Sequence, residues 1–313
     1  MEKPETISLF DFFKKFPDEE AARCYFEARR WINGKYCPHC GSVDVVEVKD
    51  HKPMPYRCKD CRKHFSVRTD TVLEESRLPL QKWLMAIYMM TTARKGIPST
   101  QLAKELGITQ KSAWFLAQRI REAFMSSRGP NAPEGGGSLS GEVEADETYI
   151  GGKEMNKHAS KKLRAGRGTV GKTIVAGVKQ RNGNVVAQIV PNTSAKILQK
   201  FVVNNVAASS TLYTDEHSSY VGMGQFSHLT VRHGAKEYVN GMAHTNGIES
   251  FWALLKRGHY GIYHYMSVKH LHRYIGEFSF RHNTAKVGTM QFIDQTITNA
   301  GQRRLTYKEL INA

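Results

Sequence analysis

The 313-residue sequence contains no long apolar run. Its longest strongly apolar stretch, from Trp83 to Met90, covers only eight residues, whereas a helix that crosses a bilayer needs about 20. Residues 1–8 carry charges of both signs and lack the apolar segment of a secretory signal. There are also no internal repeats. These absences argue against a membrane protein, and we expect a soluble cytoplasmic protein with no membrane partner.

The chain has few acidic residues relative to its basic ones. The chain has 29 Asp and Glu residues against 45 Lys and Arg residues, which gives a formal net charge of +16. A polyanionic partner is the simplest physical reason for such an excess, and nucleic acid is the commonest polyanion. The alternative is a protein that is basic only for solubility, which explains the size of the excess less well. The composition therefore favours a nucleic-acid-binding protein.

Cysteine is rare, and four of the five cysteines fall into two pairs. Cys37, Cys40, Cys58 and Cys61 follow the spacing C-x2-C-x17-C-x2-C, which is typical of a tetrahedral zinc site built from two tight turns. We predict a zinc ribbon over residues 36–70 that binds one zinc ion. Because four thiolates leave no open coordination position, the role of this zinc is structural. The remaining cysteine, Cys24, is expected to be a small buried residue.

Changes in composition divide the chain into several domains. Residues 1–35 are predicted to form an N-terminal helical segment, and residues 78–126 a second helical region. The stretch 127–141 is rich in Gly, Pro and Ser and is the predicted linker. After it, alternating strand and helix patterns over residues 142–285 indicate a mixed α/β domain. Residues 286–313 are a predicted C-terminal tail.

The second helical region has the pattern of a helix-turn-helix. A first helix over residues 100–106 is followed by Gly107 in the turn, and Thr109 can cap a second helix that ends near Phe124. The start of the second helix would face DNA, and a basic residue further along would add a backbone contact. The predicted DNA contacts are Gln110, Lys111, Ser112 and Arg119. The alternative is an ordinary helical hairpin without DNA contacts.

Three acids occupy special places in the α/β domain. Asp146 falls in the middle of the strand pattern "GEVEADETYIGG", where an unused charge is disfavoured. Asp215 ends the strand "STLYTD", and Glu249 lies on an amphipathic helix in "HTNGIESFWALLKRG". Three carboxylates from two strands and a helix could hold a pair of Mg²⁺ ions, or Mn²⁺, for phosphodiester chemistry. Each acid also has a structural alternative: a turn residue, a helix cap, and the surface partner of Lys256.

A basic segment follows the first of these strands. Residues 151–172 carry seven basic residues and one acid, and we interpret them as a loop along the DNA backbone. The alternative is a solvated loop without a partner, and the two can coexist if the loop becomes ordered on binding. The predicted backbone contacts in and beyond this segment are Lys161, Lys162, Arg164, Arg167, Lys172 and Arg257.

The order of "EADETYIGGK", "LYTDEHSSY" and "HTNGIESFWALLKRGHYGIYHYMSVKHLHRYIGEFSFRHN" resembles the DDE transposases of bacterial insertion sequences. The subfamily it resembles has an N-terminal zinc ribbon and a ribonuclease-H-like core. The resemblance implies that Asp146 and Asp215 are the first two catalytic carboxylates and Glu249 the third. It also implies that Lys256 lies near the DNA backbone. Related transposases use Asn at the third metal position, so Asn246, one turn before Glu249, is the rival ligand; our hypothesis is Glu249.

The same resemblance implies an activity. Such a protein binds the terminal inverted repeats of its element, cleaves their 3′ ends by metal-dependent hydrolysis and joins them to target DNA. It would act as a homo-oligomer on double-stranded DNA, in the bacterial cytoplasm and on the nucleoid when bound. The competing hypotheses are a non-catalytic DNA-binding regulator derived from a transposase, and a nuclease that selects branched DNA.

Overall fold

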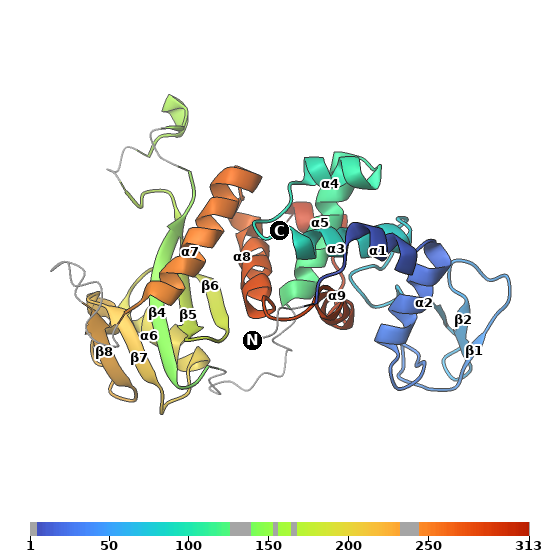
Figure 1. The fold of residues 1–313 in the computed structure, drawn as a ribbon, viewed down its shortest axis with the longest axis horizontal. Coiled ribbons are helices and arrows are strands. Elements are labelled where there is room, and N and C mark those ends of the chain that lie inside the picture. The colour runs from blue at the N-terminus through green and yellow to red at the C-terminus, as the bar shows by residue number, and fades with distance from the viewer. Residues whose placement is uncertain (1–4, 126–138, 153–155, 164–167, 232–243, 313) are drawn as a thin grey trace. The chain divides into compact units, whose positions relative to one another are not determined.

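The computed structural model describes residues 5–125, 139–152, 156–163, 168–231 and 244–312. The chain forms two compact units (Figure 1). Unit 1 contains residues 1–127 and 286–313, and unit 2 contains residues 128–285. None of the helices within the described residues has the length and apolar character needed to cross a membrane. The predicted linker, residues 127–141, falls outside the described residues as far as residue 138.

Unit 1 opens with two helices whose starts are fixed by capping residues. Helix α1 (Leu9–Lys15) is preceded by Ser8, whose hydroxyl accepts a hydrogen bond from the Asp11 N–H. Helix α2 (Glu19–Arg30) is preceded by Asp18, whose carboxylate accepts from the Ala21 N–H at 2.8 Å.

A small antiparallel sheet follows, with strands β1 (Val45–Glu47), β2 (Tyr56–Cys58) and β3 (His64–Phe65). Trp31, at the end of α2, packs edge-on against Tyr56 and Phe65, with ring centroids 5.5 and 6.1 Å apart. The sheet therefore shares a core with α2. Strands of two and three residues supply few hydrogen bonds of their own, so this region depends on other contacts for its stability.

The next three helices are α3 (Leu80–Thr92), α4 (Ser99–Leu106) and α5 (Gln110–Phe124). Gly107 ends α4 with a left-handed backbone, φ +59°, which favours glycine. Thr109 caps α5 by accepting a hydrogen bond from the Ser112 N–H at 3.2 Å. A helix, a glycine turn and a second helix therefore lie at the positions that the sequence predicts.

The last part of the chain returns to unit 1 instead of extending as a tail. Residues 286–313 contain α9 (Thr289–Thr298) and α10 (Tyr307–Asn312). On α9, Phe292 packs against Phe124 of α5 with ring centroids 5.6 Å apart, and Ile293 is fully buried. The apolar side chains at helical spacing drive this packing, because leaving them exposed would forgo their burial energy.

Unit 2 is built on a five-stranded mixed sheet. Its strands are β4 (Glu142–Ile150), β5 (Thr173–Gln180), β6 (Val185–Val190), β7 (Thr211–Asp215) and β8 (Ser227–Val231). Their order in the sheet is β6-β5-β4-β7-β8. Strand β5 is antiparallel to both of its neighbours, β4 and β6, whereas β7 and β8 run parallel to β4. This arrangement confirms the predicted mixed α/β domain.

Helices cover both faces of this sheet. Helix α6 (Ala195–Asn205) packs on one face, where Leu198 and Val202 join Val143 and Ala145 of β4 in one core. Helices α7 (Asn246–Gly258) and α8 (Val268–Asn283) pack on the other face in a second core (Figure 1). Because successive strand residues face opposite sides, the even-numbered positions of β4, Asp146 among them, face α7.

Candidate active site

Four cysteine sulfurs form one candidate metal site, in unit 1. The Sγ atoms of Cys37 and Cys61 lie 3.6 Å apart, and those of Cys40 and Cys58 lie 3.7 Å apart. All four lie within 4.8 Å of one another. A tetrahedral zinc with Zn–S bonds of about 2.3 Å would require sulfurs about 3.8 Å apart. The cysteines therefore fit one structural zinc, as predicted.

Cys24 differs from the expectation of a buried residue. It is exposed on α2, with its Sγ 3.5 Å from a Glu20 carboxylate oxygen. The buried side of this helix is formed by Ala22 and Phe26 instead. Cys24 takes no part in the four-cysteine group.

Two of the predicted acids come together at the sheet of unit 2. The last parallel pair between β4 and β7 is Glu144 with Tyr213, and Asp146 and Asp215 each lie two residues beyond it on these neighbouring strands. Burial is the main reason that the pKa of Asp146 rises to about 7, and the charges of Glu147 and Asp215 raise it further. A buried carboxylate whose ionisation is opposed by neighbouring negative charge forms a site that a cation would stabilise.

Asp146 is also held by a neighbour that the sequence did not reveal. The Trp252 indole N–H donates a hydrogen bond to its Oδ2 atom at 3.0 Å. Trp252 lies on α7, one turn after Glu249, and its ring covers Gly177 of β5. This bond holds one oxygen of the Asp146 carboxylate in place.

A further acid, Glu147, belongs to the same cluster. Burial raises its pKa, and the charge of Asp215 raises it further, whereas a hydrogen bond from the Tyr220 hydroxyl at 2.9 Å lowers it. The His217 ring nitrogen lies 3.9 Å from the Glu147 carboxylate, and the His217 backbone N–H donates to Asp215 at 3.1 Å. Strand alternation places Glu147 on the opposite face of β4 from Asp146. In the sequence, only its position next to the other acids of "EADE" could have indicated that Glu147 lies near this site.

The third predicted acid lies on the side of α7 that faces β7. Helix α7 lies over β4 and β5, and helix α8 lies over β6. The two helices meet where Phe251 of α7 contacts His282 of α8. At 100° per residue, Glu249 and Lys256 fall on the side of α7 away from α8. The β7 end, with Asp215, lies on that side of the sheet.

Glu249 and Asn246 are both exposed, and the Thr245 hydroxyl donates to Glu249 at 3.1 Å. Within the described residues, the cysteines form the one group of three or more potential ligands whose atoms lie within 4.8 Å. The structure thus brings Asp146 and Asp215 together and places Glu249 on the facing side of α7, without closing a three-carboxylate set.

The start of α7 is fastened to β4 by another acid. Glu144 is 1% exposed, and its carboxylate accepts hydrogen bonds from the Ile248 N–H at 2.8 Å and from Arg181 at 3.3 Å. A Cβ atom on Gly247 would lie 2.7 Å from this carboxylate and 2.9 Å from the Lys179 ammonium. Glu144 therefore positions the helix that carries the candidate ligands.

We predict that Gly177→Ala destabilises unit 2. A Cβ atom at this position would lie 2.6 Å from the Trp252 ring, so the ring must move away from Asp146. The free energy of unfolding should fall by about 1–3 kcal/mol, measured by urea denaturation. As a control, Gly224→Ala adds its methyl group to open space and should change stability by less than about 0.5 kcal/mol.

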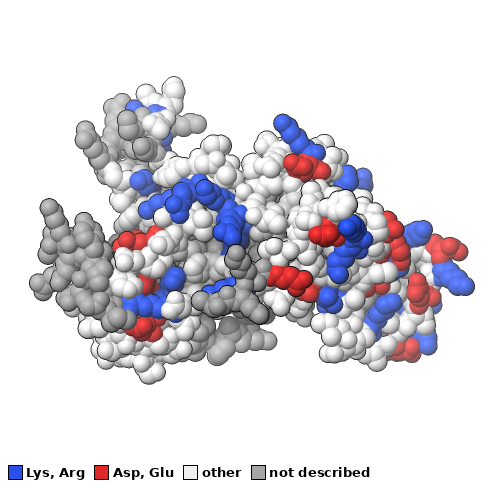
Figure 2. Space-filling model, in the orientation of Figure 1, with Lys and Arg blue, Asp and Glu red and all other residues white. Residues whose placement is uncertain are grey.

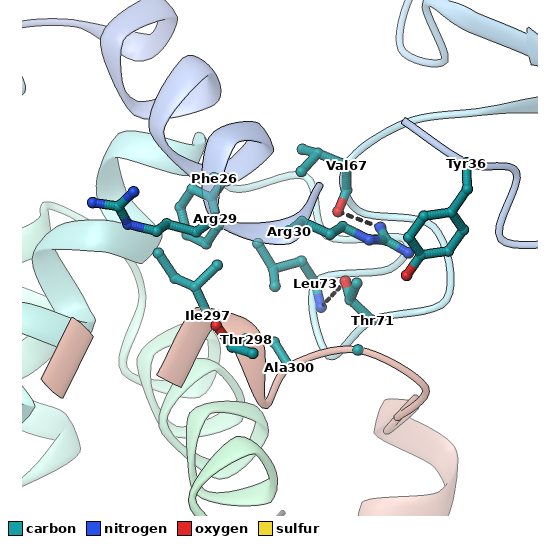
Figure 3. Close-up of a pocket in the computed structure, with 11 residues that line it drawn as sticks. Phe26, Arg29, Arg30, Tyr36, Val67, Thr71, Leu73, Ile297, Thr298 and Ala300 are labelled. Carbon is teal, nitrogen blue, oxygen red and sulfur yellow. Dashed lines mark hydrogen bonds between the residues drawn. The ribbon is translucent and has the colours of Figure 1, made fainter. Parts of the chain in front are cut away.

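A separate cavity lies within unit 1 (Figure 3). Its walls include Phe26, Arg30, Thr71 and Ile297, and the Arg30 guanidinium donates to the Val67 carbonyl at 2.7 Å. None of the residues that line it is an acid, a histidine or a cysteine. The chemistry of the acid cluster therefore belongs to unit 2 and not to this cavity.

Two segments of the chain match families of transposase domains. Residues 138–283 match the model of the ISXO2-like transposase domain, and residues 17–64 match that of the transposase zinc-ribbon domain. An uncharacterised protein in transposable element ISH50 of Halobacterium salinarum is 31% identical over 257 residues. The alignment covers 78% of this chain and 84% of that protein. The chain belongs to the ISXO2-like transposase family.

The matched segment of the transposase contains every predicted residue of the acid site, from Asp146 to Lys256. A solved structure, the Mos1 strand transfer complex, aligns at 11% identity with a TM-score of 0.28, over 69% of this chain and 78% of that one. That similarity is too low to support an argument about the fold.

Most of the predicted DNA contacts that the structure describes are accessible. In unit 1 of the transposase, Gln110 and Lys111 are exposed and Ser112 is half-buried. In unit 2, Lys162 and Arg257 are exposed, and Lys172 is half-buried against Gly151. Lys161 lies in a short 3-10 helix, η3 (Ala159–Lys161), and Arg164 and Arg167 are outside the described residues. Figure 2 shows Lys and Arg side chains gathered in a band over the part of unit 2 where α7 lies.

Arg119 is the exception. It is 4% exposed, donates a hydrogen bond to the Glu74 carbonyl and lies over the rings of Trp83 and Phe115. Burial lowers its pKa to about 10. The prediction that Arg119 contacts DNA is therefore wrong for this structure. The side chain lies on the inner face of α5, where its guanidinium makes cation–π contacts with aromatic rings instead of contacting a DNA phosphate.

Proposed function

We propose that this transposase binds the terminal inverted repeats of an insertion sequence, cleaves their 3′ ends by metal-dependent hydrolysis and joins them to target DNA by strand transfer. The observation that carries the proposal is the pair formed by Asp146 and Asp215. These carboxylates come from neighbouring parallel strands, and burial together with like charge raises the pKa of Asp146. An acid pair of this kind in a strongly basic protein suits a cation-assisted reaction on a polyanion.

The donors around this pair fit Mg²⁺, which prefers carboxylate oxygen ligands. Asp146 and Asp215 would hold the ions, and Glu249 would complete the set from α7. When bound, two such ions supply activation of the attacking oxygen and stabilisation of the leaving oxygen. Trp252 keeps the Asp146 carboxylate in one orientation, and Lys256 on the same side of α7 would attract the DNA backbone.

The proposed reaction consists of two displacements at phosphorus. In the first, water adds to the phosphodiester at the end of the element, and the 3′-oxygen leaves as a hydroxyl after taking up a proton. In the second, this 3′-hydroxyl adds to a target phosphodiester and a target 3′-oxygen leaves. The number of phosphodiester bonds is unchanged in the second step, so it needs no energy-rich cofactor.

Two structural inferences accompany the proposal. Three antiparallel strands followed by two parallel ones, with helices on both faces, support a ribonuclease-H-like domain. Helices α4 and α5, with Gly107 in the turn and exposed Gln110 and Lys111, support a helix-turn-helix that contacts the terminal repeats. Since two DNA ends must be joined to one target, we infer a homo-oligomer on DNA.

We propose that Glu249 is the third metal ligand, and substitutions on α7 test this assignment. Glu249→Ala should lower strand transfer on the order of 10³-fold, because a carboxylate ligand contributes several kcal/mol. Asn246→Ala should lower it only about 10- to 100-fold, the effect of a residue that orients a ligand. Ser250→Ala, an exposed change on the same helix, is the control. Rates of product formation on terminal DNA measure all three, and the reverse ranking would reassign the ligand to Asn246.

The proposed function itself is tested by a cleavage assay. Labelled duplexes from the ends of the element that encodes this chain are incubated with the full-length protein and Mg²⁺ or EDTA, with and without target DNA. We expect nicks at the element's 3′ ends with Mg²⁺ alone and joined products when target is added. Binding without nicking would favour a regulator, and equal cutting of branched DNA of unrelated sequence would favour a structure-selective nuclease.

A further inference from the structure

The polar side of α7 continues beyond Lys256 to an aromatic ring. Asn246, Glu249, Ala253 and Lys256 follow one another at steps of three, four and three residues on one side of α7, and Tyr260 comes four residues later, in the turn that follows the helix. Its side chain is 49% exposed. The Tyr260 hydroxyl donates a hydrogen bond to the Gly151 carbonyl at 3.4 Å, so the ring is anchored at the end of β4 while much of its surface stays open.

The segment after α7 has an irregular backbone that presents a second ring. Residues His259–Tyr263 form a π-helical turn, a feature often found at functional sites. His264 follows with φ +57°, a left-handed conformation that is costly for a residue other than glycine. Its ring nitrogen hydrogen-bonds with the Tyr260 carbonyl at 2.9 Å. The next residue, Tyr265, is 74% exposed.

Cations lie close in the chain or in space to the first of these rings, Tyr260. Lys256 and the exposed Arg257 lie in the turn of α7 just before Tyr260. A Cβ atom on Gly151, the residue that accepts the Tyr260 hydrogen bond, would lie 3.3 Å from Lys172. Exposed aromatic rings interleaved with Lys and Arg are typical of surfaces that bind unpaired nucleotides, where rings stack on bases and cations contact phosphates. A patch meant for a purely apolar partner would have fewer charges.

We propose that Tyr260 and Tyr265 form a stacking surface for unpaired bases at the end of the element's DNA. The proposal rests on the proposed function, since it takes Asp146 and Asp215 as the site of cleavage. Tyr260 lies eight residues after Trp252, the residue bonded to Asp146, which is about 12 Å along a helix axis. An unpaired strand can be more extended than the about 3.4 Å per nucleotide of a duplex strand, so Tyr260 would contact a base within about four nucleotides of the cleaved bond.

This surface makes DNA with an unpaired end a better ligand than fully paired DNA. The protein must disrupt base pairs before it can stack on the bases, and an end that is already unpaired avoids this cost. The full-length wild-type protein should therefore bind a terminal duplex with four unpaired nucleotides on the order of 10-fold more tightly than the paired duplex. 2-Aminopurine placed in that stretch should change its fluorescence on binding.

Four variants test the assignment. Tyr260→Ala and Tyr265→Ala should each lose most of the preference for the unpaired end and of the fluorescence change. Tyr260→Phe keeps the ring and should keep both, and Val268→Ala, which trims a side chain that is 64% exposed but has no ring, should also behave as wild type.

Full preference in both alanine variants would overturn the proposal, and so would an altered oligomeric state of these variants without DNA, which would assign the rings to contacts between copies. If wild type cleaves terminal DNA but shows no preference, this inference fails and the proposed function stands. If wild type neither binds nor cleaves terminal DNA, both fail.

Discussion

Asp146→Asn and Asp215→Asn are each expected to bind the terminal DNA of the element as wild type does and to cleave it on the order of 10³-fold more slowly. The two carboxylates lie on the neighbouring strands β4 and β7, and each is the proposed ligand of a catalytic ion. Replacing a carboxylate by a neutral amide removes negative charge that the ions need, and several kcal/mol of transition-state stabilisation are lost as a result. Mobility-shift titrations and initial cleavage rates measure the two effects separately.

The control for this experiment is Glu142→Gln, which makes the same change of charge on the same strand. Glu142 hydrogen-bonds with Arg181 and Tyr213 instead of facing the acid pair, and glutamine keeps an acceptor there. Its cleavage rate should stay within a few-fold of wild type. Cleavage by Asp146→Asn within 10-fold of wild type would show that this carboxylate is not a metal ligand.

Loss of zinc should have the largest effect on folding. Cys58→Ser is expected to release the zinc and unfold the ribbon, because three strands of two or three residues have little stability of their own. Structural zinc contributes about 10–16 kcal/mol of apparent binding free energy in small zinc domains. Trp31 packs on Tyr56 and Phe65 of the ribbon, so its fluorescence should shift as these rings separate. Metal analysis should give one zinc per chain in wild type and none in the variant.

Cys24→Ser is the matched control for this change. Cys24 is exposed on α2, outside the four-cysteine group, so the variant should keep one zinc per chain and the tryptophan emission of wild type. Retention of the full zinc content by Cys58→Ser, or its loss in Cys24→Ser, would contradict the assignment of the ligands.

Features that depend on local spacing could be predicted from the sequence. The CxxC pairs define their own turns, so the four zinc ligands follow from spacing alone. The apolar period of α7 fixes which residues pack and which face outward, and it places Glu249 and Lys256 on one side. Period-two alternation in "GEVEADETYIGG" correctly predicted a strand with Asp146 in its middle, which is β4.

Features that depend on contacts between distant segments could not be predicted from the sequence. Arg119 fits a basic DNA-facing position on a helix, and only the packing of α5 against Glu74 and Trp83 shows that it is buried. Glu144 shares a face with Asp146, yet it binds the first turn of α7 because Arg181 and Ile248 reach it from elsewhere in the chain. The place of residues 286–313 in unit 1 depends in the same way on the partner of Phe292.

The most direct test of the proposed reaction starts from its intermediate. A terminal duplex that already ends in a 3′-hydroxyl is mixed with the full-length protein, target DNA and Mg²⁺, beside the same duplex ending in a 3′-dideoxynucleotide. We expect the 3′-hydroxyl end to be joined to target DNA, the dideoxy end to remain unjoined, and Asp146→Asn to join neither. Joining by Asp146→Asn at the wild-type rate, or no joining by a wild-type protein that binds both duplexes, would contradict the proposed reaction.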